Sequence, residues 1–172
     1  MNRLISKHAK AGVRLLAGML LLGALAASAA QAQVAVTAAP DHATLLASDN
    51  PKAAASKRLV YDFWREVIEG GHLELADKYL TPDYIQHNPS VPTGRAGFVA
   101  FFSKFSKAKA IDAKVQAPLV DVVADGNLVV LSFVNRMPDP HEKGKTYTTT
   151  WFDMLRIEGG KVAEHWDSSQ LQ

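Results

Sequence analysis

Two short polar strings contain the side chains of this sequence that are best suited to proton transfer. They are Gln86-His87-Asn88-Pro89 and Glu164-His165-Trp166-Asp167. Histidine and carboxylate groups can take up or release protons, and amide groups can orient them by hydrogen bonding. If the fold brings the two strings together, they can form a catalytic cavity.

The chemistry that these residue types favour is proton abstraction next to a carbonyl group. A carboxylate whose pKa is raised by apolar walls can remove such a proton, while a histidine or amide donor stabilises the enolate oxygen. Asp167 and Asp153 are the candidate bases, and His165 and His87 are the candidate donors. No nucleophile or cofactor is needed. The predicted pocket residues that orient these groups or supply apolar walls are Gln86, Asn88, Tyr84, Trp64, Phe98 and Trp151.

Each candidate also has a structural interpretation. His87 could bond backbone carbonyls within a turn. Asp153 could form an inward ion pair with Arg136 or Arg156, and Asp167 could cap the end of its strand with Ser168. None of these alternatives requires a substrate.

A metal site is the other chemistry that two histidines and a carboxylate allow. Neither histidine pair has the helical spacing typical of ligands. We therefore predict a metal-free site.

Three helices are predicted before the second string. Apolar residues over 59–68 recur at i, i+3 and i+4 spacing, and Gly70-Gly71 ends this helix. A shorter helix follows and is broken at Thr81-Pro82-Asp83, which places His87 on a short strand or loop. Aromatic residues over 98–105 then form one face of a third helix.

The remainder of the chain has the composition and alternation of β-strands. Turn sequences rich in Gly, Pro, Asp and Asn separate strands predicted over 114–123, 128–136, 145–157 and 162–169. Helices followed by a meander predict an α+β fold, in which four long antiparallel strands curve strongly around the helices and leave a conical cavity.

The last hairpin decides whether the polar residues meet. A three-residue loop after Ile157 would set Asp153 opposite His165. It would also set Trp151 opposite Asp167, and the period of two would place all four side chains on one face. A two-residue turn would instead shift the register and point Asp153 away.

Residues 1–32 have the pattern of a secretory signal peptide. Positions 1–14 carry four basic residues and no acid, positions 15–30 are almost wholly apolar, and Ala30-Gln31-Ala32 has the small-x-small pattern of a cleavage site. A membrane anchor is the alternative, but the apolar run is short and rich in Ala and Gly. We therefore expect a periplasmic or secreted protein without a stable membrane anchor.

Composition restricts the remaining part of the chain. We expect a flexible lead-in over 33–50 and one domain over 51–172, because 172 residues with 48% apolar content suffice for a single core. The net charge of +2 comes from the first 32 residues, and the rest has 15 basic against 17 acidic residues. This balance argues against nucleic-acid binding. The absence of cysteine excludes disulfides and thiol nucleophiles.

Two motifs resemble those of the SnoaL-like branch of the NTF2-like superfamily. The first is 84–89 with Gly94 and Phe98 after it, and the second comprises 153–157 and 160–167. The resemblance extends over about residues 55–170. It implies a curved sheet over three helices, a deep apolar cone, frequent dimers and no cofactor.

In the family's polyketide cyclases, the resemblance implies an intramolecular aldol condensation. It matches His87 to a cavity-lining histidine, and His165 and Asp167 to the acid/base region of the terminal strand. The sequence departs from the pattern at Ser132, where many relatives have a histidine.

Three functional hypotheses follow. The first is an enzyme that performs aldol, isomerase or lyase chemistry on a small hydrophobic carbonyl compound. The others are a non-catalytic binder of a small apolar ligand and a dimeric interaction module. We expect a homodimer that uses Phe152, Met154 and Trp166 on the outer face of the sheet.

Overall fold

The computed structural model describes residues 33–170, so the predicted signal peptide lies outside the described part. The fold below is that of the unit formed by residues 34–172. No helix among the described residues is long and apolar enough to cross a membrane. The elements are α1 (His42–Leu46), α2 (Pro51–Phe63), the π-helical segment η1 (Trp64–Glu69), the 3-10 turn η2 (Leu73–Leu75), α3 (Ala76–Tyr79), β1 (Leu80–Gln86), α4 (Arg95–Phe102), β2 (Leu119–Asp125), β3 (Leu128–Pro138), β4 (Thr146–Glu158) and β5 (Lys161–Asp167).

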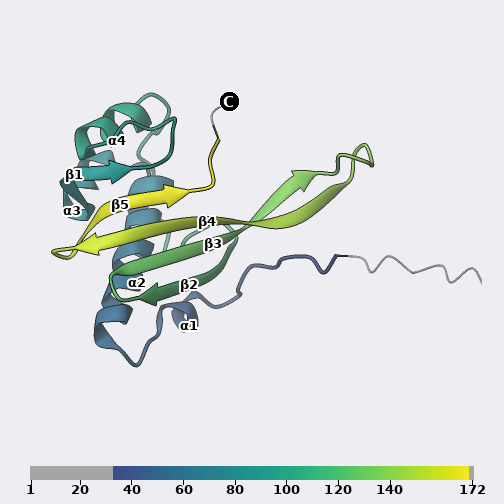
Figure 1. Ribbon diagram of the computed structural model, residues 1–172, viewed down its shortest axis with the longest axis horizontal. Helices are drawn as coiled ribbons and strands as arrows, with labels where there is room; N and C mark the ends of the chain where they lie inside the picture. Colours follow the sequence, from purple (N-terminus) through teal and green to yellow (C-terminus); the bar gives the residue numbers. More distant parts are fainter. Residues whose placement is uncertain (1–32, 171–172) are drawn as a thin grey trace, which may run out of the picture. The chain divides into compact units, whose positions relative to one another are not determined.

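The strands form one sheet in the order β1-β5-β4-β3-β2. The four long strands pair antiparallel, as predicted, and β1 adds a fifth strand that runs parallel to β5 (Figure 1). β1 contains Pro82, which cannot donate to a ladder and is tolerated in this edge strand. This proline and the irregular burial of the strand explain why the sequence indicated only a short strand or loop.

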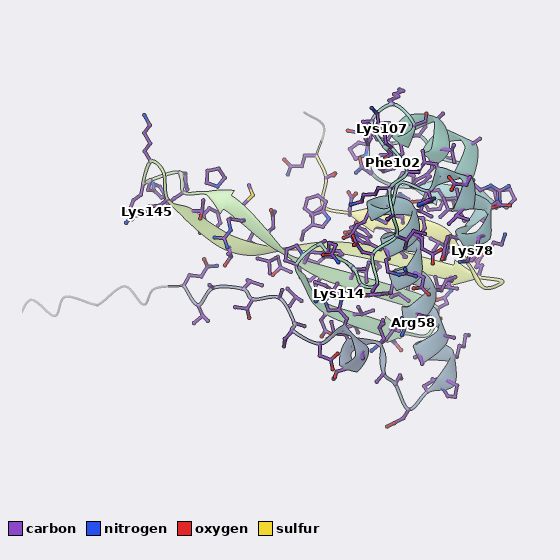
Figure 2. All side chains as sticks on the ribbon, turned by 180° about the vertical axis from the view of Figure 1, so that it is seen from behind. Arg58, Lys78, Phe102, Lys107, Lys114 and Lys145 are labelled. Carbon is purple, nitrogen blue, oxygen red and sulfur yellow. The ribbon has the colours of Figure 1, made fainter. Side chains whose placement is uncertain are left out.

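Helix α2 supplies most of the helical layer. It begins at Asn50, whose Oδ1 accepts from the backbone N–H groups of Lys52 and Ala53, and Pro51 occupies the first helical position. The helix lies behind the strands in Figure 1 and in front of them in Figure 2. Its buried side chains include Val60 and Phe63, which belong to the core between helix and sheet.

The packed structure begins before Pro51, where the sequence placed its start. Val36 N–H donates to Thr148 Oγ1 at 2.8 Å, and Ala39 N–H donates to the Leu119 carbonyl at 2.8 Å. The short helix α1 follows, and Leu46 at its end is only 7% exposed. Much of the lead-in therefore contacts the domain.

The turn between β4 and β5 differs from the prediction. Glu158 pairs with Lys161, so the loop has two residues, Gly159 and Gly160, both at positive φ as a type I′ turn requires. The prediction of a three-residue loop was therefore wrong. A bulge at Ala163 then inserts one extra residue into β5 and shifts the register again.

The bulge keeps the polar residues on one face. Asp153 lies opposite Asp167 and Leu155 lies opposite His165, where the prediction paired Asp153 with His165 and Trp151 with Asp167. The individual pairs were wrong, but the predicted cluster on the inner face is confirmed because Asp153, His165 and Asp167 all line one cavity.

Candidate active site

A cavity of about 270 Å³ lies between the helical layer and the inner face of the sheet. One part of its wall is aromatic and the other is polar. Phe102 of α4, labelled in Figure 2, belongs to the aromatic part. All six predicted pocket residues line the cavity, namely Trp64, Tyr84, Gln86, Asn88, Phe98 and Trp151.

The centre of the polar wall is a hydrogen-bonded chain of three side chains. Asp153 Oδ1 lies 2.9 Å from His165 Nε2, and His165 Nδ1 lies 2.8 Å from Gln86 Oε1. Asp153 is 3% exposed and His165 is 9% exposed. Because water is largely excluded, each of these bonds is stronger than it would be at the surface.

Asp153 has the environment of a general base. Burial raises the pKa of its carboxyl, and the nearby charge of Asp167 adds to this rise. The hydrogen bond and charge of His165, and to a smaller extent hydrogen bonding from the Trp151 side chain, oppose it. Its Oδ2 is buried and has no hydrogen-bond partner among the described residues. A carboxylate oxygen in this state is poorly solvated and therefore basic.

Asp167 is held more firmly by its neighbours. Asn88 Nδ2 donates to its Oδ2 at 2.7 Å, and the backbone N–H of Ser169 donates to its Oδ1 at 2.9 Å. The expected strand-end cap therefore exists, although it binds Ser169. Both oxygens of Asp167 accept a hydrogen bond, whereas Oδ2 of Asp153 accepts none among the described residues, so Asp153 is the better-placed candidate base.

Tyr84 contributes more than the apolar wall that the sequence assigned to it. Its hydroxyl accepts a hydrogen bond from Gln86 Nε2 at 2.9 Å, and the residue is 2% exposed. Burial, and then the charges of Asp153 and Asp167, raise its pKa, so the hydroxyl stays protonated. The alternation of a strand could have revealed this role, because it places Tyr84 on the same face as Gln86.

His87 does not enter the cavity, so its predicted role as a cavity donor is wrong. Its ring stacks on Trp166 at 5.1 Å between centroids, and its Nε2 lies 2.7 Å from Glu164 Oε1. Its side chain is 45% exposed. Gln86 and Asn88 face the cavity, so the residue between them faces outward.

The alternative ion pairs of Asp153 are also not observed. Arg156 Nε donates to Glu164 Oε2 at 2.7 Å, and Arg136 Nη1 donates to Thr146 Oγ1 at 3.4 Å. Both arginines therefore have other partners, and the partner of Asp153 is His165.

A family model for the SnoaL-like domain matches residues 60–165. The chain belongs to the SnoaL-like family. No protein of curated function matches the sequence significantly.

Solved structures similar to this SnoaL-like protein include a candidate polyketide cyclase from Acidithiobacillus ferrooxidans, with 22% identity over 66% of this chain and 86% of that one and a TM-score of 0.46. IdmH, a candidate polyketide cyclase from Streptomyces antibioticus, has 21% identity over 65% of this chain and 89% of that one, with a TM-score of 0.44. An LEH-like epoxide hydrolase from M. tuberculosis has 12% identity over 68% of this chain and 84% of that one, with a TM-score of 0.47.

The polar wall of this SnoaL-like protein also contains a set of atoms that could ligate a cation. One ligand atom from each of Asp153, His165 and Asp167 lies within 4.8 Å of the others. However, His165 Nδ1 faces Gln86 and its Nε2 faces Asp153. A cation at this position would have to replace the proton between His165 and Asp153.

Proposed function

We propose that this SnoaL-like protein performs cofactor-free acid/base chemistry, of aldol, isomerase or lyase type, on a small hydrophobic carbonyl compound. The observation that supports it best is Asp153, a buried carboxyl with a raised pKa and an unpartnered Oδ2 among the described residues, in an aromatic cavity. A buried carboxyl with a raised pKa and an open oxygen has the properties that a general base requires.

In the proposed step, Asp153 Oδ2 removes a proton from the carbon next to the carbonyl. The C–H bond breaks, an O–H bond forms on Asp153, and the electron pair moves onto the carbonyl oxygen to give an enolate. Tyr84 donates its O–H to that oxygen. His165 shares a proton with Asp153 Oδ1, so proton uptake leaves the pair positively charged and stabilises the enolate.

The cavity favours a compact substrate. Its volume of about 270 Å³ lies just below the roughly 300–1,000 Å³ of typical ligand sites. The buried indole Nε1 of Trp64, which has no hydrogen-bond partner among the described residues, adds a further donor to the wall. One apolar ring system with a carbonyl group fits this combination of walls and donors.

Deuterium exchange tests the proposed step without knowledge of the natural substrate. Cyclohexanone, acetophenone and 1-tetralone would be incubated with protein in D₂O, and loss of the α-proton signal would be followed by NMR. We expect the protein to accelerate exchange of at least one ketone, and Asp153→Asn to lower that rate by about 10²- to 10⁴-fold.

His87→Gln is the matched control, because His87 lies outside the cavity. Its exchange rate should equal that of the unmodified protein, whereas His165→Gln should lower the rate. Ketone binding without any exchange would contradict the proposal and favour the non-catalytic binder.

We also propose export through residues 1–32 and assembly as a homodimer. The pattern of those residues supports export. The dimer is supported by exposed apolar residues on the sheet face that α2 does not cover, where Val123 is 53% and Phe152 52% exposed. Monomeric mass in light scattering at micromolar concentration would contradict the dimer, and retention of residues 1–32 in protein recovered from the periplasm or medium would contradict cleavage.

A further inference from the structure

We propose that the side-chain amide of Gln86 fixes the positions of the protons on both His165 and Tyr84, and so makes Gln86 the positioning residue of the site. The inference about the protons stands on geometry alone, and only its effect on rate rests on the proposed function.

The orientation of the Gln86 amide is set by the backbone. The N–H of Asn88 donates to Gln86 Oε1 at 2.8 Å. A backbone N–H can only donate, so the atom that receives it must be the amide oxygen and not the nitrogen. The amide therefore cannot flip without losing this bond, and Nε2 must point to the other side.

This fixed oxygen determines the tautomer of His165. Gln86 Oε1 lies 2.8 Å from His165 Nδ1, and an amide oxygen can only accept. Nδ1 must therefore carry a proton. A tautomer protonated only at Nε2 would set two lone pairs against each other at this distance.

The consequence extends to Asp153. With Nδ1 protonated, one proton remains to be shared across the 2.9 Å between His165 Nε2 and Asp153 Oδ1. The pair is either imidazolium with carboxylate or imidazole with carboxylic acid, and it is neutral in both forms. The proton-accepting capacity of the pair then resides in Asp153 Oδ2.

The fixed nitrogen determines the rotation of the Tyr84 hydroxyl. Gln86 Nε2 donates to Tyr84 Oη at 2.9 Å, so the hydroxyl's own proton must point elsewhere. Because Tyr84 lines the cavity, this proton is available to a ligand oxygen. The Gln86 amide thus orients both the His165–Asp153 pair, which accepts a proton, and the Tyr84 hydroxyl, which donates a hydrogen bond.

The side-chain amide of Asn88 is fixed by a backbone N–H in the same way. The backbone N–H of Ser90 donates to Asn88 Oδ1 at 2.9 Å, and this leaves Asn88 Nδ2 to donate to Asp167 Oδ2 at 2.7 Å. Asp167 Oδ2 is consequently held as a hydrogen-bond acceptor. The two amides of the first polar string therefore act on the cavity, although the histidine between them does not.

Long-range ¹H–¹⁵N spectra of the histidine side chains test the inference, with the His165 signals assigned by their loss in His165→Gln. We expect Nδ1 of His165 to be protonated at neutral pH in the purified protein. Gln86→Leu removes the acceptor and should convert a detectable share of His165 to the Nε2–H tautomer. Gln86→Glu retains an acceptor and should restore Nδ1–H.

Gln86→Glu also separates the two roles of the amide. A carboxylate cannot donate to Tyr84, so Tyr84 should turn its O–H toward the introduced carboxylate and lose its role as donor to a ligand. We expect ketone exchange to fall about 10²- to 10³-fold in Gln86→Glu although the tautomer is restored.

Gln116→Leu is the matched control, because Gln116 Nε2 donates to the Lys114 carbonyl and Gln116 does not line the cavity. It should leave the His165 signals unchanged. An Nε2–H tautomer in the unmodified protein, or unchanged spectra in Gln86→Leu, would overturn the inference. If Gln86→Leu does not fold, the unmodified protein and Gln86→Glu still decide it. The expected tautomer without any ketone exchange would keep this inference and reject the proposed function.

Discussion

Asp153→Asn should make the fold more stable at neutral pH while it removes the proposed base. In the folded state the pKa of Asp153 is raised above its ordinary value of 3.8, chiefly by burial. A group with a raised pKa contributes stability that is fully present below its unfolded pKa and is lost as pH rises through the folded pKa. The carboxylate therefore costs stability near neutral pH, and an amide has no such cost.

The size of this stability difference follows from the single proton that Asp153 binds or releases. Asp153 has one pKa in the unfolded chain and a raised pKa in the folded protein. Between these two pH values, the free energy of unfolding of the unmodified protein should fall by about 1.4 kcal/mol per pH unit relative to that of Asp153→Asn. The hydrogen bond to His165 need not be lost, because an amide nitrogen at position 153 can donate to Nε2 when Nδ1 holds the imidazole proton.

Urea unfolding of both proteins from pH 3 to pH 8 measures this difference. Other carboxylates act in the opposite sense, such as Glu164, whose pKa is lowered by hydrogen bonds from His87 and Arg156. They are present in both proteins, so they cancel in the difference between the two unfolding free energies. The advantage of Asp153→Asn should grow from pH 4 upward and then level off.

Asp125→Asn serves as the control, because Asp125 is exposed at the end of β2 and should change stability by less than about 0.5 kcal/mol. The reasoning is refuted if Asp153→Asn is less stable at pH 7 by a pH-independent amount. Asp153 would then be a stabilising partner of His165, which is the structural alternative to a poised base.

Three further predictions concern the site and its frame. Tyr84→Phe leaves Gln86 Nε2 unpaired, so urea unfolding should show a loss of about 1–3 kcal/mol and ketone exchange should slow by about 10²-fold; an unchanged exchange rate would reject Tyr84 as a donor. Gly71→Ala should lower Tm, because Gly71 has φ +70° and an added Cβ would lie 2.5 Å from the Lys107 carbonyl oxygen; an equal Tm would contradict this. Elemental analysis should find no stoichiometric metal after dialysis, and chelators should leave ketone exchange unchanged, because Asp153 shares a proton with His165 Nε2; stoichiometric zinc or iron would contradict both.

The helices and the long strands could be predicted from the sequence because their signals are local. The apolar spacing before Gly70 and the alternation in β3 and β4 depend on residues close together in the chain. The pairing of β1 with β5 depends on contacts between distant segments, and Pro82 argues locally against a strand.

The candidate site was predictable where alternation alone decides it. Tyr84 and Gln86 share a face, and the same rule turns His87 outward, yet the resemblance to relatives favoured an inward His87. The hydrogen-bond role of Gln86 could not be predicted, because it depends on the backbone N–H of Asn88 within a folded turn.

The bulge at Ala163 has a consequence for changes in chain length. A hairpin of the same length without the bulge would set Trp166 opposite Asp153 and turn His165 outward. Because the extra residue is accommodated within the strand, deletion of position 163 would produce a regular ladder with the same residues facing inward. A deletion at position 163 of this chain should therefore keep both polar groups on the inner face, whereas a single insertion between positions 165 and 167 would separate them.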